Sequence, residues 1–354
     1  VGGYAVALAT SMDTIFGGKA GSVFFCASDI GWVVGHSYIV YAPLLAGMAT
    51  IVYEGLPTWP DCGVWWTIVE KYQVSRMFSA PTAIRVLKKF PTAEIRKHDL
   101  SSLEVLYLAG EPLDEPTASW VSNTLDVPVI DNYWQTESGW PIMAIARGLD
   151  DRPTRLGSPG VPMYGYNVQL LNEVTGEPCG VNEKGMLVVE GPLPPGCIQT
   201  IWGDDGRFVK TYWSLFSRPV YATFDWGIRD ADGYHFILGR TDDVINVAGH
   251  RLGTREIEES ISSHPGVAEV AVVGVKDALK GQVAVAFVIP KESDSLEDRD
   301  VAHSQEKAIM ALVDSQIGNF GRPAHVWFVS QLPKTRSGKM LRRTIQAICE
   351  GRDP

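Results

Sequence analysis

Short hydrophobic runs alternate with segments of helical spacing along the first part of the chain. Three such runs are rich in β-branched and aromatic residues: SVFFCAS, ATIVYE and VSRMFSA. Each precedes a stretch, such as VWWTIVEKY or PTAIRVLKKF, whose hydrophobic residues recur at helical spacing. A further run, LEVLYLAGEPL, ends in a glycine turn. Strand and helix in alternation predict crossover connections and a largely parallel sheet, whose ligands gather at the carboxyl ends of the strands. We therefore expect an α/β fold.

The pattern changes after residue 150, where glycine and proline punctuate shorter strands. YNVQLLN, GMLVVEG and the hairpin GIRDADGYHFILGR, with its Asp232-Gly233 turn, predict an antiparallel β subdomain. A smaller α/β unit follows, with a helix that ends before HPG and strands at AEVAVVGV and VAVAFVIP. We therefore divide the chain into a large domain, residues 1–241, and a small domain, residues 242–354.

The charge balance of the chain is acidic. A formal net charge of -10 argues against nucleic acid or an anionic membrane as a partner. An anionic ligand would therefore need a local basic patch, and one exists between Asp314 and Glu350, where no acidic residue occurs. The basic residues of this stretch are Arg322, Lys334, Arg336, Lys339, Arg342 and Arg343. They fit either an anionic ligand or a solvated tail that balances the acidic stretch 292–306.

Cysteine and histidine usage indicates neither disulfides nor a metal cage. The five cysteines form no CxxC pair and are odd in number, which suits a reducing compartment, so we expect a cytoplasmic protein. The seven histidines show no zinc-ligand spacing.

An uncharged stretch from Ile30 to Tyr53 is long enough to span a membrane. Gly35 and Pro43 interrupt it, which favours a buried helix followed by a strand. No signal peptide is recognisable, and the first residue is Val1 rather than Met, so we expect that the natural N-terminus is missing.

The basic stretch contains a turn followed by a helix. In SGKMLRRTI, residues 337–345, Leu341 and Ile345 share one helical face. The N-terminal end of a helix offers main-chain amide donors to an anion, although its dipole disfavours a lysine there. Turn, helix start and clustered cations together favour a phosphate or carboxylate ligand for Lys339. The sequence is not a P-loop, because no GxxxxGK[ST] occurs.

Four motifs stand in the order typical of one enzyme family. They are NYWQTESG (132–139), YATFDWG (221–227), GRTDDVINVAGHRLGTREIE (239–258) and LPKTRSGK (332–339). With them the chain resembles, along essentially its whole length, the AMP-forming acyl-CoA synthetases of the adenylate-forming superfamily. SDIGWVVGHSY and HRLGTREIEE are most similar to the short-chain members, the acetyl- and propionyl-CoA synthetases.

The resemblance implies a fold and a reaction. The fold would be a large N-terminal adenylation domain of α/β layers with a β subdomain, incomplete here, and a small mobile α/β domain. In the reaction a short-chain carboxylate, preferably propionate, would attack the α-phosphate of ATP to give acyl-AMP and pyrophosphate. The thiol of coenzyme A would then displace AMP. The alternatives are an acetate-using ligase, an adenylation domain that loads a carrier protein, and a nucleotide-binding protein without turnover.

The resemblance also implies which residues hold the nucleotide and coenzyme A. Asp131 would lie near the exocyclic amine of adenine, and Asp225 and Arg240 would hold the ribose hydroxyls. Gly249 would move toward the pantetheine of coenzyme A. The adenine ring would be lined by Gly110, Glu111 and Pro112. Outside the motif context, Glu111 and Asp225 could instead cap loops, and Arg240 could form a surface salt bridge.

Further residues are implied at the reacting atoms. Thr136 would hydrogen-bond the α-phosphate, and Glu137 would hold Mg²⁺, which prefers oxygen ligands. Arg251 would approach the phosphate or the ribose, and Lys339 would stabilise charge on the reacting carboxylate and phosphate oxygens. Asp242 stands where the family has the hinge of its mobile domain, with a turn or helix-capping aspartate as the alternative. Because acylation of Lys339 would erase its charge, a lysine acyltransferase and a deacylase are implied partners.

The acyl pocket is implied at Val33, Val34, Ala109 and Trp134. Acetate-using relatives typically carry valine at the position of Ala109, and removing two methyl groups leaves room for one more carbon. Trp134 would exclude long chains, although it could also be a plain core residue. One methylene in an apolar pocket is worth about 1 to 3 kcal/mol, so we expect a real but not absolute preference for propionate over acetate.

One motif of the family is absent. The phosphate loop, of the form T-S-G-[ST]-T-G-x-P-K-G, would lie just before the first residue of the chain. Its amides normally hold the β- and γ-phosphates of ATP, so we expect this chain alone to form the adenylate poorly or not at all. Apolar surface that faces the missing part is expected to be exposed.

Overall fold

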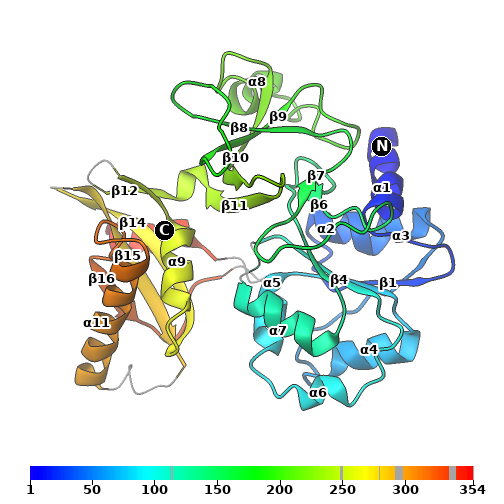
Figure 1. Cartoon of the computed structure of the whole chain (residues 1–354), viewed down its shortest axis with the longest axis horizontal. Coiled ribbons are helices and arrows are strands. Elements are labelled where there is room, and N and C mark those ends of the chain that lie inside the picture. Colours follow the sequence, from blue (N-terminus) through cyan, green and yellow to red (C-terminus); the bar gives the residue numbers. More distant parts are fainter. Residues whose placement is uncertain are drawn as a thin grey trace. The chain divides into compact units, whose positions relative to one another are not determined.

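The computed structural model describes residues 1–111, 113, 115–247, 250–278, 280–291, 298–334 and 340–353, without the side chains of Asp242, His250 and Arg251. The chain forms two compact units, which are described separately (Figure 1). The first consists of Val1–Thr223 and Gly227–Ile237, and the second of Phe224–Trp226 and Leu238–Pro354.

A parallel sheet lies between two groups of helices in the first unit (Figure 1). Its strands, in the spatial order β2-β1-β3-β4-β5, are β1 (Val23–Cys26), β2 (Ala49–Thr50), β3 (Arg76–Ser79), β4 (Val105–Ala109) and β5 (Val129–Asn132). Every neighbouring pair is parallel, so the carboxyl ends lie along one edge. The expected α/β class is therefore confirmed, although the run ATIVYE contributes only the short strand β2.

Helices cover both faces of this sheet, because successive strand residues point to opposite sides. Phe24 and Phe78 join one buried cluster, and their neighbours Phe25 and Met77 join another. The first cluster is covered by α1 (Gly2–Thr14), α2 (Val33–Gly35), the π-helix η1 (His36–Tyr41) and α3 (Ala42–Leu45). The second is covered by α4 (Val64–Tyr72), α5 (Pro81–Leu87), α6 (Ala93–Arg96) and α7 (Glu115–Leu125). Figure 1 shows the two groups on opposite sides of the strands.

The uncharged stretch from Ile30 to Tyr53 folds into this unit as a helix followed by a strand, as expected. Its Tyr38 is fully buried in the first cluster, whereas Leu44 and Leu45 are exposed. Among the residues that the structure describes, no helix is long and apolar enough to cross a membrane.

A second sheet corresponds to the expected β subdomain; it belongs to the first unit except for Phe224–Trp226 of one strand and the end of another, which are counted with the second. Its strands, in the order β11-β10-β9-β8, are β8 (Asn167–Leu171), β9 (Gly185–Glu190), β10 (Val220–Arg229) and β11 (His235–Arg240). Strands β8 and β9 are antiparallel, and the predicted turn joins β10 to β11 with Gly233 at φ +87°. A short pair, β6 (Met143–Ala144) and β7 (Val161–Pro162), and helix α8 (Asp205–Tyr212) lie in the connections.

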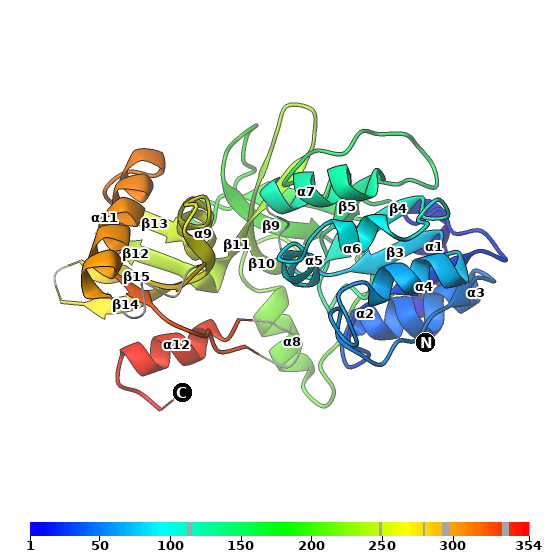
Figure 2. The ribbon, with the colours of Figure 1, turned by 90° about the horizontal axis from the view of Figure 1, so that it is seen from below.

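The second unit is a smaller α/β sandwich. Its strands are β12 (Val244–Val247), β13 (His250–Gly253), β14 (Val267–Asp277), β15 (Gly281–Pro290) and β16 (His325–Phe328), in the order β13-β12-β15-β14 with β16 parallel to β15. Its helices are η2 (Thr241–Asp243), α9 (Thr254–Ser262), α11 (Arg299–Gln316) and α12 (Arg342–Cys349). Figure 2 shows α9 and α11 on one side of this sheet and α12 on the other. Accordingly, Ile257 and Ile309 share one buried cluster and Ile345 belongs to another.

Candidate active site

The carboxyl ends of β4 and β5 bring two predicted segments together in the first unit. Ala109, the last residue of β4, is the register partner of Asn132, the last residue of β5. Gly110 follows at φ +102°, a conformation that favours glycine, and a Cβ there would meet no atom within 4 Å. The main chain therefore leaves the sheet beside open space, as a close approach of a ligand to the backbone requires.

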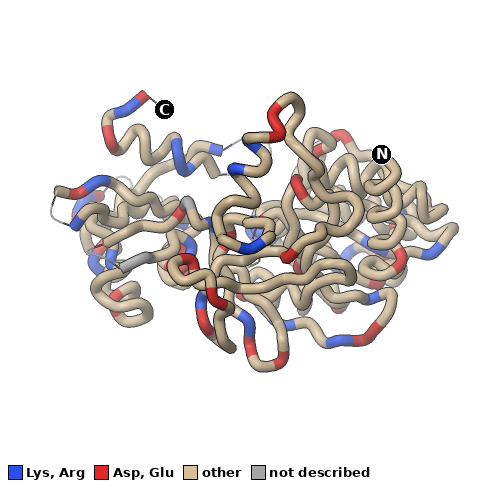
Figure 3. The backbone as a smooth tube through the Cα atoms, turned by 90° about the horizontal axis from the view of Figure 1, so that it is seen from above, with Lys and Arg blue, Asp and Glu red and all other residues tan. Residues whose placement is uncertain are grey.

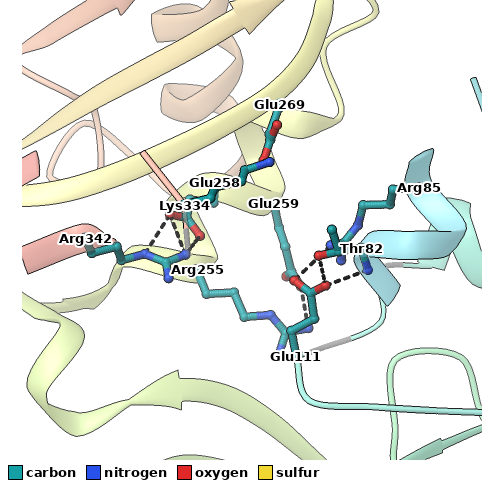
Figure 4. Close-up of polar contacts among 9 residues, drawn as sticks. All are labelled: Thr82, Arg85, Glu111, Arg255, Glu258, Glu259, Glu269, Lys334 and Arg342. Carbon is teal, nitrogen blue, oxygen red and sulfur yellow. Dashed lines mark hydrogen bonds and ion pairs between the residues drawn. The ribbon is translucent and has the colours of Figure 1, made fainter. Parts of the chain in front are cut away.

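Glu111 is engaged by helix α5. Its Oε1 accepts a hydrogen bond from the main-chain N–H of Thr82 at 2.6 Å and another from the Thr82 hydroxyl. Its Oε2 lies 3.0 Å from Nη1 of Arg85 (Figure 4). A carboxylate that accepts from a first-turn N–H stabilises a helix start. The carboxylate of Glu111 thus has the capping role that was the alternative to adenine contact.

The motif at 132–139 forms a turn that is held by hydrogen bonds to residues of β10. Gln135 donates from Nε2 to the carbonyl of Thr223 at 2.6 Å and accepts from the hydroxyl of Tyr221 at 3.2 Å. Thr136, at the tip, is exposed, so its hydroxyl is available to a ligand. Glu137 is half-buried and accepts a hydrogen bond from Tyr212 at 3.1 Å.

Sequence reasoning missed the residues that support this turn. Tyr212, from α8, stacks on Tyr221, from β10, with ring centroids 5.2 Å apart and planes 12° from parallel. Tyr221 opens the motif YATFDWG and Gln135 lies in the turn motif itself, but the family resemblance assigned neither of them a role. Because these contacts join residues more than seventy positions apart, no local sequence signal could have identified them.

Three of the four residues assigned to the acyl pocket lie around one core cluster. Ala109 is 6% exposed within it, and Val34 and Trp134 pack against it. The ring of Trp134 meets that of Tyr38 edge-on, with centroids 5.5 Å apart and planes at 71°. Val33 is half-buried at the start of α2. The predicted pocket wall, Ala109, and the predicted floor, Trp134, therefore belong to the same cluster.

Asp225 and Arg240 are neighbours in the second unit. Asp225 is 6% exposed on β10, and its Oδ1 lies 3.8 Å from Nη1 of Arg240, at the end of β11. That separation allows an ion pair but is too long for a hydrogen bond. The guanidinium of Arg240 also lies 6.0 Å from the centre of the Phe224 ring. The two residues proposed to hold the ribose therefore lie together. A salt bridge without a ligand, which was the alternative role of Arg240, would give the same arrangement.

Asp131 lies on β5, where one of its carboxylate oxygens accepts the N–H of Asn132 at 2.9 Å. Pro112, Gly249 and Lys339 lie outside the described residues. Asp242 belongs to η2, and the main chain of Arg251 pairs with Asn246 on β12, but neither side chain is described. The roles assigned to these residues stay predictions.

The basic stretch between Asp314 and Glu350 is only partly available to an anion. Arg322 pairs with Asp314 at 3.0 Å, Lys334 pairs with Glu269, and Arg342 pairs with Glu258 at 2.7 Å. Figure 3 shows basic residues at the start of α12 and both signs of charge near the C-terminus. Cations that sequence analysis grouped as one patch are thus partly committed to carboxylates of the protein.

A cavity of about 390 Å³ lies in the first unit beside β8. Its lining residues are Asn167, Val168, Gln169, Leu170, Pro178, Cys179, Arg218, Arg229 and His235. None of the predicted site residues lines it. The described residues also contain no group of three or more histidine, cysteine, aspartate or glutamate side chains that could hold a metal ion.

The fold and these motifs agree with comparisons to known proteins. The family described as AMP-binding enzyme matches residues 3–197, and the AMP-binding enzyme C-terminal domain matches residues 256–339. The chain belongs to the AMP-binding enzyme family. The resemblance inferred from the four motifs is therefore confirmed.

Relatives within this AMP-binding family include short-chain CoA ligases. A propionate–CoA ligase of Salmonella typhimurium is 90% identical over 354 residues, which are 100% of this chain and 56% of that protein. An acetyl-coenzyme A synthetase of Pyrobaculum aerophilum is 43% identical over 355 residues, 99% of this chain and 52% of the relative. The chain thus spans about half the length of the curated relatives it matches.

A solved structure shares the fold of this AMP-binding enzyme. The crystal structure of an anthranilate CoA ligase in complex with anthranoyl-AMP matches with a TM-score of 0.80 at 23% identity. The match covers 98% of this chain and 63% of the other. The expected adenylate-forming α/β fold is therefore confirmed.

Proposed function

We propose that the protein carrying this sequence activates a short-chain carboxylate, with propionate preferred, through acyl-AMP to acyl-CoA and releases AMP and pyrophosphate. It would be an acid–thiol ligase, a propionate–CoA ligase. The observation that carries the proposal is the 90% identity over the whole chain to a propionate–CoA ligase. Retention of the four motifs in order supports it.

Residues 1–241 would belong to the adenylation domain, and residues 242–354 would form a mobile domain that turns about Asp242. The position of the C-terminal family match, which begins at residue 256, supports this division. Few backbone torsions need to change at such a hinge for a large rotation. After adenylation the rotation would withdraw Lys339 and bring Gly249 toward the pantetheine of coenzyme A.

The adenosine of ATP would bind at the carboxyl end of β4 and at the Asp225–Arg240 pair. The open space at Gly110 gives the adenine room beside the main chain, with Pro112 and Asp131 near its edge. Asp225 would accept hydrogen bonds from the ribose hydroxyls, and Arg240 would donate to them. Since Glu111 already caps α5, its contribution to adenine binding would come from its main chain.

Lys339 would act where charge develops. A carboxylate oxygen of propionate attacks the α-phosphorus of ATP, and the bond to the bridging oxygen breaks, so pyrophosphate leaves with the electron pair. The ammonium of Lys339 and the hydroxyl of the exposed Thr136 would stabilise the oxygens involved, with Arg251 nearby. One such donor commonly contributes about 3 kcal/mol to a transition state.

Mg²⁺ would bind through Glu137 and the phosphates of ATP. Mg²⁺ is usually held by one or two carboxylates together with substrate oxygens rather than by a protein cage. The described residues fit this, since they offer Glu137 but no cluster of three metal ligands. When bound, the ion would neutralise phosphate charge. Tyr212 orients the carboxylate that would hold it.

The acyl chain would lie against Ala109, with Val33 and Val34 beside it and Trp134 as the floor. The packing of Ala109, Val34 and Trp134 around one cluster supports this assignment. A cytoplasmic location, and a lysine acyltransferase and deacylase that act on Lys339, complete the proposal.

The test uses a composite enzyme, in which this chain replaces the matched part of the Salmonella typhimurium ligase. We would measure AMP release with straight-chain acids from formate to valerate, with and without coenzyme A. We expect sustained, coenzyme A-dependent release that is fastest for propionate, and little release by this chain alone. A preference for acetate would support the acetyl-CoA synthetase alternative, to which the Pyrobaculum relative belongs. Loading of a carrier protein without thioester formation on coenzyme A would overturn the proposal.

A further inference from the structure

Main-chain contacts join the described residues on either side of 335–339. Lys334 and Met340 form an antiparallel bridge, and the N–H of Leu341 donates to the carbonyl of Pro333 at 3.0 Å. Lys334 and Met340, the described residues on either side of 335–339, are therefore held side by side. Lys339 directly precedes Met340 in the chain.

The carboxylate of Glu258 holds the C-terminal end. Arg342 lies three positions after Lys339, at the start of α12, and its guanidinium contacts both oxygens of Glu258. Nε and Nη2 donate to Oε1 at 3.2 and 2.9 Å, and Nη2 reaches Oε2 at 2.7 Å (Figure 4). Glu258 also accepts the main-chain N–H of Val272 at 2.8 Å, so a single buried carboxylate links α9, β14 and α12.

The N-terminal end has a weaker attachment. Lys334 pairs with Glu269 on β14 (Figure 4), and the two side chains are 29% and 31% exposed. A half-exposed lysine pair contributes little, whereas a bidentate arginine pair fixes both distance and orientation. Most of the constraint therefore comes from Glu258 and Arg342.

Stability alone does not account for the pair of Glu258 and Arg342, whose side chains are 12% and 31% exposed. Helix α12 already packs on the sheet through Ile345, beside Leu332 and Val273. Burying the carboxylate of Glu258 costs much of what its attraction to the partly exposed guanidinium returns, so well-packed apolar residues would stabilise the helix about equally well. What a bidentate pair adds is a defined geometry.

We propose that Glu258, acting through Arg342, is a positioning residue that presents Lys339 for the adenylation step. This inference rests on the proposed function, because it assumes that Lys339 serves that step. Pre-orientation of a charged donor lowers the barrier only for the reaction in which the donor takes part. Glu258 should therefore matter for acyl-AMP formation and not for thioester formation.

The experiment is the substitution Glu258→Gln in the composite enzyme. Glutamine keeps the shape and an acceptor for the N–H of Val272 but loses the charge that orients Arg342. We expect kcat of propionate-dependent ATP–pyrophosphate exchange to fall about tenfold, with KM for ATP and propionate nearly unchanged. Thioester formation from pre-formed propionyl-AMP and coenzyme A should stay within about twofold of the parent. Equal losses in both half-reactions, or no loss in exchange, would overturn the inference.

Two further variants keep the test decisive. Arg342→Lys retains the charge without the bidentate contact, so the rate of exchange should fall less than with Glu258→Gln. If Glu258→Gln does not fold, Arg342→Lys takes its place, and an unchanged exchange rate in this variant would overturn the inference. Asp314→Asn is the matched control, since it breaks the 3.0 Å pair with Arg322 in the same unit and should change neither half-reaction. If Lys339→Gln leaves exchange intact, the proposed function fails. If Lys339→Gln abolishes exchange and Glu258→Gln does not slow it, only this inference fails.

Discussion

The hydroxyl of Tyr212 donates a hydrogen bond to Oε1 of Glu137 at 3.1 Å. The hydrogen bond fixes one oxygen of the carboxylate to which we assign Mg²⁺. Tyr212 in turn stacks on Tyr221, which donates to Gln135. The turn that carries Thr136 and Glu137 is therefore held by α8 and β10 and not by its own sequence alone.

The first prediction concerns this support. Tyr212→Phe removes a hydrogen bond to a charged group, which is worth about 1.5 to 3 kcal/mol. We expect roughly a tenfold higher Mg²⁺ concentration for half-maximal pyrophosphate exchange in the composite enzyme. The control is Tyr164→Phe at an exposed tyrosine. An unchanged Mg²⁺ midpoint in Tyr212→Phe would mean that Tyr212 does not orient a metal-binding carboxylate.

The second prediction concerns the acyl pocket. Ala109 is 6% exposed and packs in the cluster that Trp134 joins, so Ala109→Val should fill the space for the third carbon of propionate. We expect the ratio of kcat/KM for propionate to that for acetate to fall roughly tenfold, in line with about 1 to 3 kcal/mol per methylene. Competition between the two acids in AMP release measures this ratio directly. If the variant weakens both acids equally, Ala109 does not form the wall.

The third prediction separates the two roles of Glu111. Because its carboxylate caps α5 through Thr82 and pairs with Arg85, Glu111→Ala should lower the free energy of unfolding by about 1 to 2 kcal/mol. KM for ATP should change little, because only the main chain would face the adenine. Urea unfolding gives the first quantity and exchange kinetics the second. Glu94→Ala, at a surface pair with Lys97, serves as the low-effect control. A large rise in KM without loss of stability would contradict the capping role.

The fourth prediction concerns acid stability. Burial, with the nearby charge of Arg229, lowers the pKa of His235 from 6.5 to about 4. Between pH 6.5 and 4 the unfolded chain therefore binds a proton at His235, whereas His235 in the folded chain stays neutral. The free energy of unfolding thus falls as the pH drops from 6.5 toward 4. The contribution lost is about 3 kcal/mol at its limit. Thermal unfolding of His235→Gln should show a shallower decline over this range than the parent.

The parallel sheet and the core could be predicted from the sequence, because burial imposes a short-range pattern. The alternation of Phe24 with Phe25 between the two clusters is an example. The position of Ala109 at the end of a strand followed from the glycine turn after it. Four ordered motifs then gave the family.

Partners of individual charges could not be predicted, because they depend on contacts between distant positions. Arg342 and Glu258 are 84 positions apart, and Glu111 and Thr82 are 29 apart. Sequence analysis therefore grouped Arg342 and Lys334 with Lys339 as one basic patch, which fitted either an anionic ligand or a solvated tail. The structure instead pairs both with carboxylates of the second unit. Lys334, which precedes residues 335–339, pairs with Glu269, and Arg342, which follows them, pairs with Glu258.

The most direct measurement compares the two half-reactions of Lys339→Gln in the composite enzyme. Loss of the ammonium should reduce propionate-dependent ATP–pyrophosphate exchange by at least about a hundredfold, as removal of one preorganised donor does elsewhere. Conversion of supplied propionyl-AMP and coenzyme A to the thioester should continue at nearly the parent rate. An undiminished exchange rate would contradict the account.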